Sequence, residues 1–539
     1  MALMRGWRRR EWLGSMAAAA LVGCDRDAPN SYDGTWLGAD HALGHRLREA
    51  KSGGWGEPAV QRRVAVLVVG AGIAGLAAAR AFAKAGLDDC HVLDLEHEPG
   101  GNSRGHTMAG MRCPLGAHYL PLPGDRATEV IALLEELGLR RTEHGAPVYD
   151  ERYLCHSPQE RLFIDGQWHD GLLPPIEALP AAQRAPTLAQ YRRFAAAVAR
   201  AGAEAEFSMP TARAAWSPAL DALDQTPFAA WLDANDFDAP ALRWYLDYCC
   251  RDDYGAGAAR VSAWAGLHYF ASRHGFHAPG EGSGEPDNVL TWPEGNAWLA
   301  RRLAEPLAER MHTGRLAVRV DEGRHEVVVD AWDVSTQRLE RWTAQKVVLA
   351  VPLFIAARLF SAPPPALTAA VAAMRYAPWL VANLQLREAL RDHAGAAPSW
   401  DNMLYADPPS SALGYVDAMH QSLLPYAGPT VLTAYWAFGG ASDAQAHADR
   451  ARLLAEPWAA WSSRVVQSLA AAHPDLPAKI VRVDLMRYGH AMSIPLPGVR
   501  SSAALRTLAD QRGRVRFAHS DLSGYSVFEE ALYRGARVA

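Results

Sequence analysis

The sequence predicts an α/β protein organised around a parallel β-sheet. Residues Val64 to Val69 form a continuous apolar run rich in β-branched side chains, which is typical of a strand buried on both faces. Glycines at positions 70, 72 and 75 follow it at G-x-G-x-x-G spacing, and a helical pattern continues to about Ala85. A second apolar segment ends in Asp94, 24 residues after Gly70. This order of strand, glycine turn, helix and acid predicts a Rossmann-like nucleotide-binding unit.

The glycine turn and the acid have defined roles in such a unit. Gly70 permits a tight turn, Gly72 lets the backbone approach a pyrophosphate, and Gly75 lets helix and strand pack closely. The helix N-terminus presents free N–H groups and a positive dipole end to the phosphates, and the acid binds a ribose hydroxyl. We therefore predict that a dinucleotide contacts this unit through Gly70, Ala71, Gly72, Ile73, Ala74, Gly75 and Asp94.

Length and composition narrow the class of protein. At 539 residues the chain exceeds what one hydrophobic core supports, so two or three domains are expected. Its net charge of −5 argues against a nucleic-acid partner. The six cysteines include no C-x-x-C pair and no Cys/His metal spacing, so we expect neither a metal site nor a disulfide framework.

The amino terminus resembles a bacterial export signal. Residues 8–13, Arg-Arg-Arg-Glu-Trp-Leu, resemble a twin-arginine motif, and the apolar segment from Met16 to Gly23 is too short to span a bilayer. Leu21-Val-Gly-Cys24 resembles a lipobox, in which the chain is cut before Cys24 and the thiol is lipidated. Residues 1–24 are therefore predicted to be a signal peptide and residues 25–58 a tether. The protein is expected in the periplasm, held at the inner membrane by lipid on Cys24.

Motifs after Asp94 resemble those of a known superfamily. Residues 99–104, Pro-Gly-Gly-Asn-Ser-Arg, and residues 115–118, Leu-Gly-Ala-His, resemble segments of the flavin-containing amine oxidases and their relatives protoporphyrinogen oxidase and phytoene desaturase. The resemblance implies a GR2-type FAD-binding domain in which Asp94 binds ribose and Gly101 lies at the phosphates. Asn102 stands where the family usually has Arg, and Arg104 is expected to take over that contact. The resemblance also places Gly116, Ala117 and His118 along the flavin ring.

The carboxyl-terminal residues extend the resemblance, which covers roughly residues 62–539. Asp521 follows a predicted strand and matches an acid that contacts ribityl or phosphate groups. Val527 and Phe528 match the start of a last helix whose N-terminus points at the flavin N1–C2=O edge, and Ser526 begins a predicted capping box. Val318, in a predicted hairpin, matches a residue whose backbone contacts the adenine.

The chain is expected to alternate between two domains. The FAD-binding domain takes residues 59–125, 284–362 and 482–539, and the substrate-binding domain takes residues 126–283 and 363–481. Helical patterns recur at 129–138, 188–203 and 228–250, and strands are predicted at 379–386 and 430–438. The predicted class is thus α/β, with a Rossmann-like FAD-binding domain of the GR2 type interleaved with an α+β substrate-binding domain.

Three functions are considered from the resemblance. The first is a flavin amine oxidase or dehydrogenase, in which a substrate C–H next to nitrogen gives a hydride to flavin N5. The second is a dehydrogenase or desaturase of a carbon substrate. It is kept because the lysine that many amine oxidases carry in the strand matching 377–386 is absent, the four lysines lying at 51, 84, 346 and 479. The third is a flavin protein that transfers electrons without turnover.

These motifs do not determine the catalytic residues. His118, Tyr435, Trp436 and His490 are candidates because the resemblance places their segments near the flavin. Residues 488–497 match the segment that holds the family's covalent cysteine and contain no Cys, so FAD is expected to bind non-covalently. The substrate is expected to be a small molecule, and the electron acceptor O2 or a respiratory-chain component.

Overall fold

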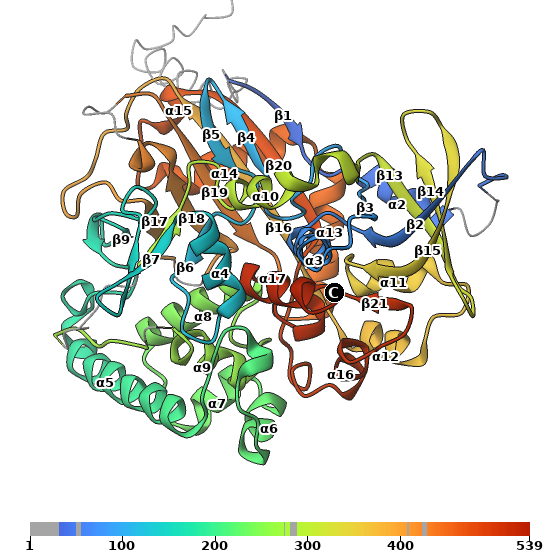
Figure 1. The fold of residues 1–539 in the computed structure, drawn as a ribbon. Helices are drawn as coiled ribbons and strands as arrows, with labels where there is room; N and C mark the ends of the chain where they lie inside the picture. Colours follow the sequence, from blue (N-terminus) through green and yellow to red (C-terminus); the bar gives the residue numbers. More distant parts are fainter. Residues whose placement is uncertain (1–31, 50–54, 274, 281–287, 407–408, 423–427) are drawn as a thin grey trace, which may run out of the picture.

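A computed structural model of the chain describes residues 32–49, 55–273, 275–280, 288–406, 409–422 and 428–539. Two large sheets organise these residues, one of seven strands and one of eight, and helices lie against both (Figure 1). The predicted α/β class is confirmed. The predicted signal peptide, Cys24 included, lies outside the described residues.

The seven-stranded sheet carries the glycine turn. Its strand order is β12 (Met311–His312), β3 (Cys90–Leu93), β2 (Val60–Val69), β15 (Arg338–Leu349), β14 (Val327–Asp333) and β13 (Arg315–Glu322), with β21 (Val515–Phe517) also pairing with β15. β2 runs parallel to both β3 and β15. Residues 66–69 of β2 are buried, as a strand covered on both faces requires.

Helices cover both faces of this sheet. On one face lie α3 (Ile73–Lys84), α4 (Thr128–Glu136), α10 (Ala297–Ala304) and α17 (Phe528–Ala536). On the other lie α11 (Leu353–Leu359), α12 (Pro365–Ala373) and α16 (Ala503–Ala509). α3 and α17 lie against each other (Figure 1), and a Cβ at Gly535 would be 2.1 Å from the Ala74 carbonyl oxygen. The missing side chain thus lets the carboxyl-terminal helix approach the glycine turn.

The eight-stranded sheet forms the base of the second domain. Its strand order is β1 (Asp33–Leu37), β20 (Ile480–Ser493), β16 (Tyr376–Leu386), β19 (Thr430–Ala437), β18 (Ala412–Asp417), β17 (Asp401–Leu404), β9 (Glu160–Ile164) and β10 (Gln167–Asp170). Side chains alternate along β16, so that Trp379 and Val381 face one core while Leu380 and Ala382 face another. The sheet therefore has two buried faces.

A helical cap covers one face of this sheet. It consists of α5 (Ala181–Glu204), α6 (Pro218–Gln225), α7 (Phe228–Ala234), α8 (Pro240–Tyr254) and α9 (Ala263–Ala271), drawn in green tones in Figure 1. The opposite face packs against α13 (Asp443–Ala455) and α14 (Trp458–Ala470). The single helix predicted over 228–250 is instead two, because the chain breaks at Asp236, where φ is 56°, and restarts at Pro240.

The predicted tether over residues 25–58 requires correction. Residues 33–37 form β1, which pairs in parallel with β20 from Asp33 opposite Arg482 onward. α2 (His41–Glu49) then buries Leu43 and Leu47 in the core of the seven-stranded sheet. The segment is polar in composition, yet Trp36 and Leu37 of β1 are half-buried against the two cores of the eight-stranded sheet. Residues 32–49 therefore belong to the folded body.

Two predicted domain limits also change. β20 begins before the predicted limit at residue 482 and continues to Ser493 in the eight-stranded sheet, so residues 480–493 belong with the substrate side. α4 was expected in the substrate domain but packs with α3 and α17. The predicted capping box is absent, because Ser526 Oγ accepts from the Ser493 backbone N–H at 2.9 Å, and α17 begins at Phe528 without a side-chain cap. The hydroxyl that was expected to cap the helix therefore bonds the last residue of β20 instead.

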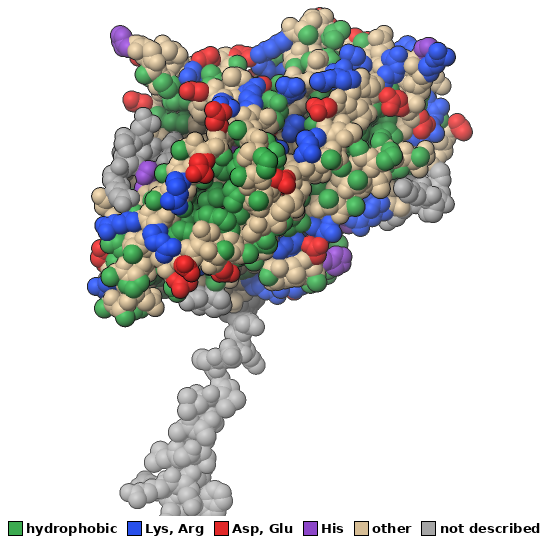
Figure 2. Space-filling view, turned by 90° about the horizontal axis from the view of Figure 1, so that it is seen from below, with side chains coloured by type: hydrophobic (Ala, Val, Ile, Leu, Met, Phe, Trp, Pro, Cys, Tyr) green, Lys and Arg blue, Asp and Glu red, His purple; other side chains and the backbone are tan. Residues whose placement is uncertain are grey.

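The outer surface carries charges of both signs. Figure 2 shows Lys and Arg side chains interspersed with Asp and Glu over one face, in keeping with the small net charge of −5. None of the helices in the described ranges is long and apolar enough to cross a membrane.

Candidate active site

The turn between β2 and α3 faces Gly101 across a gap that is lined by backbone atoms. Gly70 has φ of +104°, and a Cβ there would lie 2.6 Å from the Ala350 carbonyl oxygen. A Cβ at Gly75 would lie 1.8 Å from the Gly70 oxygen, so this glycine lets α3 approach the strand. Gly72 has extended backbone, and its Cα would be 3.2 Å from a Cβ at Gly101. Gly72 and Gly101 therefore face each other with no side chain between them.

The N-terminus of α3 opens into the same gap. The first intrahelical bond at this end runs from Leu76 N to Gly72 O, so the N–H groups of residues 73–75 have no carbonyl partner within the helix. Ile73 and Ala74 line the cavity described below. Free N–H groups and the positive end of the helix dipole suit a phosphate there.

Asp94 joins the turn to the end of β3. Its carboxylate accepts hydrogen bonds from Ala71 N at 2.5 Å and from Glu96 N at 2.8 Å. Burial raises the pKa of Asp94 to about 6 although these two donors favour the ionised form. The acid thus fixes the shape of the glycine turn and still lines the cavity beside it.

A cavity of about 370 Å³ runs from this gap to the larger sheet. It brings together most of the predicted cofactor residues and three of the four catalytic candidates, His118 among both. Those that line it are Gly70, Gly72, Ile73, Ala74, Asp94, Gly101, Asn102, Gly116, Ala117, His118, Asp521, Val527 and Phe528, with Tyr435 and His490. Residues far apart in the sequence therefore meet along one elongated space.

The remaining predicted residues do not line the cavity. Ala71 and Gly75 are buried within the turn itself. Arg104 lies 3.4 Å from the Glu96 carboxylate, with which it forms an ion pair, and Val318 is buried in the sheet core. Trp436 points to the opposite face of β19 from Tyr435 and packs near Trp461, because successive side chains of a strand alternate. Trp436 is therefore withdrawn as a catalytic candidate.

The carboxylate of Asp521 offers an unused acceptor to the cavity. Its Oδ2 accepts from Tyr376 Oη at 2.7 Å and from Leu353 N at 2.9 Å. Its Oδ1 is buried, lies 3.2 Å from His519 Nδ1 in an ion pair, and accepts no hydrogen bond from the described residues. Burial opposes ionisation, but neighbouring His519 and these donors outweigh it and lower the pKa of Asp521. A hydroxyl or N–H group of a ligand would complete the hydrogen bonding of this acid.

These features fit a bound dinucleotide such as FAD. A side chain on either glycine would fill the gap between Gly72 and Gly101, and the N-terminus of α3 supplies N–H donors beside this gap. The Oδ1 of Asp521, which accepts no hydrogen bond from the described residues, belongs to a residue that lines the same cavity, where a ribityl hydroxyl would be its donor. None of the five described cysteines lines the cavity.

Aromatic side chains hold the segment expected along the flavin ring. His118 stacks on Tyr435 with ring centroids 4.4 Å apart, and Tyr435 Oη donates to Gly116 O at 3.2 Å. Tyr488 Oη donates to Leu115 O at 2.7 Å. Burial lowers the pKa of His118 to about 3, so its imidazole stays neutral at ordinary pH. The structure therefore gives His118 a packing partner and no charge.

His490, the last catalytic candidate, is similar. Its ring lies 4.6 Å from that of Phe354, and burial lowers its pKa to about 3, with Arg450 acting in the same direction. Both histidines are thus weak bases in this fold.

A smaller inner chamber of about 120 Å³ adjoins the cavity. His118, Tyr119, Pro121, Asp252 and Arg273 line both spaces. Most of the other walls of the inner chamber are aromatic or acidic, namely Tyr245, Tyr248, Tyr269, Phe270 and Trp400, with Glu160 and Asp401. The rest of the lining is Gln159, Leu172, Gly275, Asn288 and Val289.

The acids at and beside the chamber differ in their partners. Asp253, which lines the main cavity only, is paired with Arg273 at 3.0 Å and accepts from Tyr525 Oη at 2.7 Å. Asp252 accepts from Tyr119 Oη at 3.3 Å, and burial together with the charge of Asp253 raises its pKa to about 7. Burial and the charges of Glu160 and Asp252 raise the pKa of Asp401 well above its usual value. The chamber thus gathers carboxyl groups that a cation would stabilise.

This acidic chamber is not among the features predicted from the sequence. The available signal was the adjacent pair Asp252-Asp253 near the end of α8, a helix rich in aromatic residues. Asp401 and Arg273 had no such signal. No described lysine lines either space, and β16 presents Trp379 and Val381 to the cavity instead. Within the described residues no three His, Cys, Asp or Glu side chains could hold a metal ion.

Comparison with solved structures shows the same fold in several enzymes. Putrescine oxidase bound to putrescine has 21% identity and a TM-score of 0.60, and the match covers 88% of this chain and 98% of that one. Cyclohexylamine oxidase from Brevibacterium oxydans IH-35A has 19% identity and a TM-score of 0.61, covering 88% and 97%. A CLA-producing fatty acid isomerase from P. acnes has 14% identity and a TM-score of 0.61, also covering 88% and 97%. At these identities the likeness concerns the fold alone.

No curated protein sequence matches the chain. The family model described as flavin containing amine oxidoreductase matches residues 73–539, which include the helix α3, the whole lining of the inner chamber and all of the cavity lining except Gly70 and Gly72. With the cleft for a dinucleotide and the fold in agreement, the chain belongs to the flavin containing amine oxidoreductase family and is a flavin-dependent oxidoreductase.

Proposed function

We propose that the protein is an FAD-dependent oxidase or dehydrogenase of a small amine, with FAD bound non-covalently. The observation that carries this proposal is the inner chamber, where Asp252 and Asp401 lie among aromatic side chains at the end of the cofactor cleft. A protonated amine is attracted both by carboxylates and by the faces of aromatic rings. Among the described residues, the one cationic side chain that lines the chamber, Arg273, is already paired with Asp253, so the chamber favours a cationic substrate over an anionic one.

Residues of the cleft would hold FAD at defined places. The gap between Gly72 and Gly101, with the N-terminus of α3, suits the diphosphate; Asp94 suits a ribose hydroxyl, and Asp521 a ribityl hydroxyl. When bound, FAD supplies the acceptor for a hydride from the C–H next to nitrogen, after which the imine hydrolyses.

The chain's own residues would bind and deprotonate the amine. Asp252 is the carboxyl group that lines both spaces, so it can bind the ammonium group and receive its proton. The Tyr119 hydroxyl orients the Asp252 carboxylate, while Arg273 neutralises Asp253 next to it. Buried Trp400 and Tyr435 exclude water from the reacting centre.

One observation favours a second function, oxidation of a carbon substrate. The lysine that many amine oxidases carry is absent from β16, and no described lysine lines the cavity. The acids of the inner chamber weigh against this alternative, because they would repel a carboxylate substrate.

Anaerobic bleaching of the flavin would separate the two. Purified protein is mixed with polyamines, monoamines, amino acids, porphyrinogens and unsaturated fatty acids, and the loss of the flavin absorbance is followed. We expect bleaching by an amine, and weaker amine binding in Asp252→Asn. Bleaching by a fatty acid or porphyrinogen and by none of the amines would overturn the amine proposal.

We also propose that the protein is exported by the twin-arginine route and anchored by lipid on Cys24. The support is the order of the motifs, since residues 8–13 precede a short apolar segment and then a lipobox. Two or more acyl chains give stable attachment where one does not. At the membrane, O2 or a respiratory-chain component would accept the electrons.

A further inference from the structure

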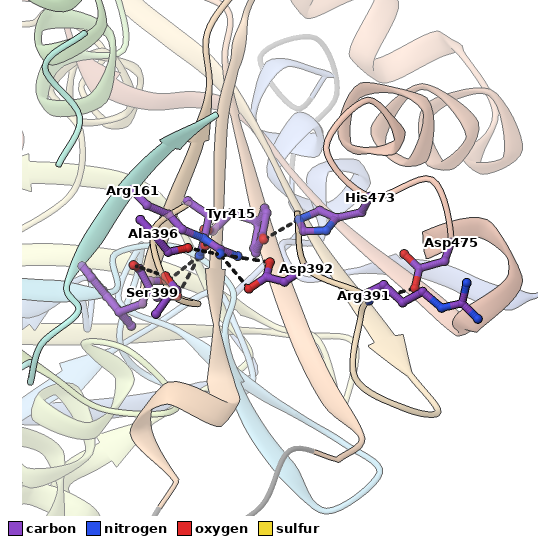
Figure 3. Close-up of polar contacts among 11 residues, drawn as sticks. Arg161, Arg391, Asp392, Ala396, Ser399, Tyr415, His473 and Asp475 are labelled. Carbon is purple, nitrogen blue, oxygen red and sulfur yellow. Dashed lines mark hydrogen bonds and ion pairs between the residues drawn. The ribbon is translucent and has the colours of Figure 1, made fainter. Parts of the chain in front are cut away.

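A buried arginine lies directly behind the acidic wall of the inner chamber. Arg161 is only 3% exposed and follows Glu160 on β9, so strand alternation turns it away from the chamber. Its Nε donates to Asn402 Oδ1 at 2.5 Å, and its Nη1 lies 3.0 and 3.1 Å from the two Asp392 oxygens (Figure 3). Its guanidinium carbon is 4.0 Å from the centroid of the Trp168 ring. The Nε, the Nη1 and one face of the guanidinium are thus occupied.

These contacts fix the segment 391–400, which leads into β17. Arg161 Nη1 also donates to Ala396 O at 3.3 Å. The Trp168 backbone bonds the segment on both sides, with its N–H on Ala394 O at 3.1 Å and its oxygen accepting from Ala396 N at 2.9 Å. Gly395 lies between them with φ of +118°, and a Cβ there would be 1.9 Å from Trp168 O. Only glycine allows this close approach.

The segment ends in residues of the chamber wall. Asn402, held by Arg161, donates its Nδ2 to Ser399 O at 2.9 Å, and the same nitrogen lies 3.2 Å from Trp400 O. Trp400 and Asp401 line the chamber, and the Trp400 ring lies 5.5 Å from that of His118. The guanidinium therefore reaches the wall through one intermediate residue.

The wall needs such support because of its charge. In the parallel pairing of β9 with β17, Asp401 is the partner of Glu160 and Asn402 the partner of Arg161. Like charges directly opposite each other destabilise a strand pair. On the far side of the same two strands the Arg161–Asn402 bond joins them, which opposes their separation.

We propose that Arg161 is a positioning residue that holds Trp400 and Asp401 in place for substrate binding. This inference rests on the proposed function for the choice of an amine as ligand, but the ordering of the wall does not depend on it. Loss of the guanidinium should loosen the segment 391–402 and weaken substrate binding. The rate of flavin reduction at saturating substrate should change little, because Arg161 touches neither cavity.

The test uses the flavin-loaded full chain and three variants. Arg161→Gln removes the guanidinium. Asp392→Asn weakens the Arg161–Asp392 ion pair at its partly exposed member, where a substitution endangers folding less than at the buried arginine. Arg260→Gln is the matched control, since Arg260 is also buried and bonds an aspartate, Asp443, and a carbonyl, yet lines neither space. Hydrogen exchange of peptides covering 391–402 is measured without substrate, and stopped-flow flavin reduction with the best substrate found.

For Arg161→Gln we expect faster exchange in 391–402 and about tenfold weaker substrate binding, with a limiting reduction rate within about threefold of wild type. Asp392→Asn should show the same split to a smaller degree, and the double variant should be less than additive. Arg161→Lys should fail to restore binding, because a lysine cannot bond Asn402 and Asp392 together.

Three outcomes would overturn the inference. Unchanged exchange in both clamp variants would show that the guanidinium does not order the segment. Faster exchange with unchanged substrate binding would show that the wall does not need it. An equal effect of Arg260→Gln on binding would assign the loss to general destabilisation. If only carbon substrates reduce the wild-type flavin, the amine proposal fails, and the same two measurements with that substrate still decide the role of Arg161.

Discussion

Gly72→Val should abolish flavin binding while leaving the fold intact. Gly72 has φ of −70° and ψ of 179°, an extended conformation that valine adopts readily. A Cβ there would be 3.9 Å from the nearest atom, Gly101 Cα, which is an ordinary contact. The direct cost to folding should therefore stay within about 0.5 kcal/mol. The two methyl groups would instead fill the gap in which the diphosphate is expected.

The size of the effect follows from ligand linkage. A cofactor present at 100 times its dissociation constant stabilises the folded state by about 2.7 kcal/mol, and the variant loses that contribution. Gly72→Val should therefore melt like flavin-stripped wild type and below flavin-loaded wild type. The assay is the ratio of flavin to protein absorbance after purification, with thermal melts of all three samples.

Two further glycines serve as comparisons. A Cβ at Gly75 would be 1.8 Å from Gly70 O, so Gly75→Ala should strain the turn itself, by about 1–3 kcal/mol, and melt below stripped wild type. Gly124 is exposed with no atom within 4 Å of an added Cβ, and Gly124→Val should keep its flavin. Wild-type flavin occupancy in Gly72→Val would refute the placement of the cofactor.

Three other predictions follow from the site and the sequence. In the folded protein the pKa of Asp252 is raised to about 7 from 3.8, so between these two pH values the folded state holds a proton that the unfolded state has lost. The free energy of unfolding therefore falls with rising pH, by up to about 1.4 kcal/mol per pH unit. Asp252→Asn should raise the melting temperature more at pH 8 than at pH 4, and an equal gain at both would contradict the assignment. Acid precipitation should release all the flavin into the supernatant, since no described cysteine lines the cavity; yellow colour that stays in the pellet would show a covalent link. Replacing Arg9 and Arg10 by Lys should leave flavin-loaded precursor in the cytoplasm, and Cys24→Ala should block the cut before residue 24. Cell fractionation and the mass of the amino-terminal peptide test both expectations. An unprocessed protein that begins at Met1 in wild-type cells would rule out the export proposal.

The two ends of the cofactor domain were predictable because their signals are local. A buried strand, three glycines, a helix and Asp94 lie within 31 residues from 64 to 94, and each has its own steric or electrostatic reason. The C-terminal acid and helix start, Asp521 and Phe528, are similarly close in sequence. Such units keep their geometry whatever the rest of the chain does.

The inner chamber could not be predicted because no local pattern defines it. Trp400 and Asp401 lie at the start of β17 and Glu160 lies on β9, and the pairing of these two strands brings them together. Asp252 joins them from α8, which packs over the same sheet. The same limit explains why Trp436 was wrongly included among the catalytic candidates. Strand alternation shows that Tyr435 and Trp436 face opposite sides of the sheet, but it does not show which side holds the cavity.

The pairing of β1 with β20 constrains the order in which the molecule is assembled. Thr35 donates its backbone N–H to the Asp484 carboxylate at 3.1 Å, across 449 residues of sequence. A ribosome that has just made the first strand must still synthesise nearly the whole chain before its partner exists, so this edge of the eight-stranded sheet cannot close during translation. Until then the β1 segment, which follows the proposed signal peptide by a few residues, has no partner strand. A chain shortened to begin at residue 59 would leave the outer edge of β20 open, and we expect it to self-associate through that edge.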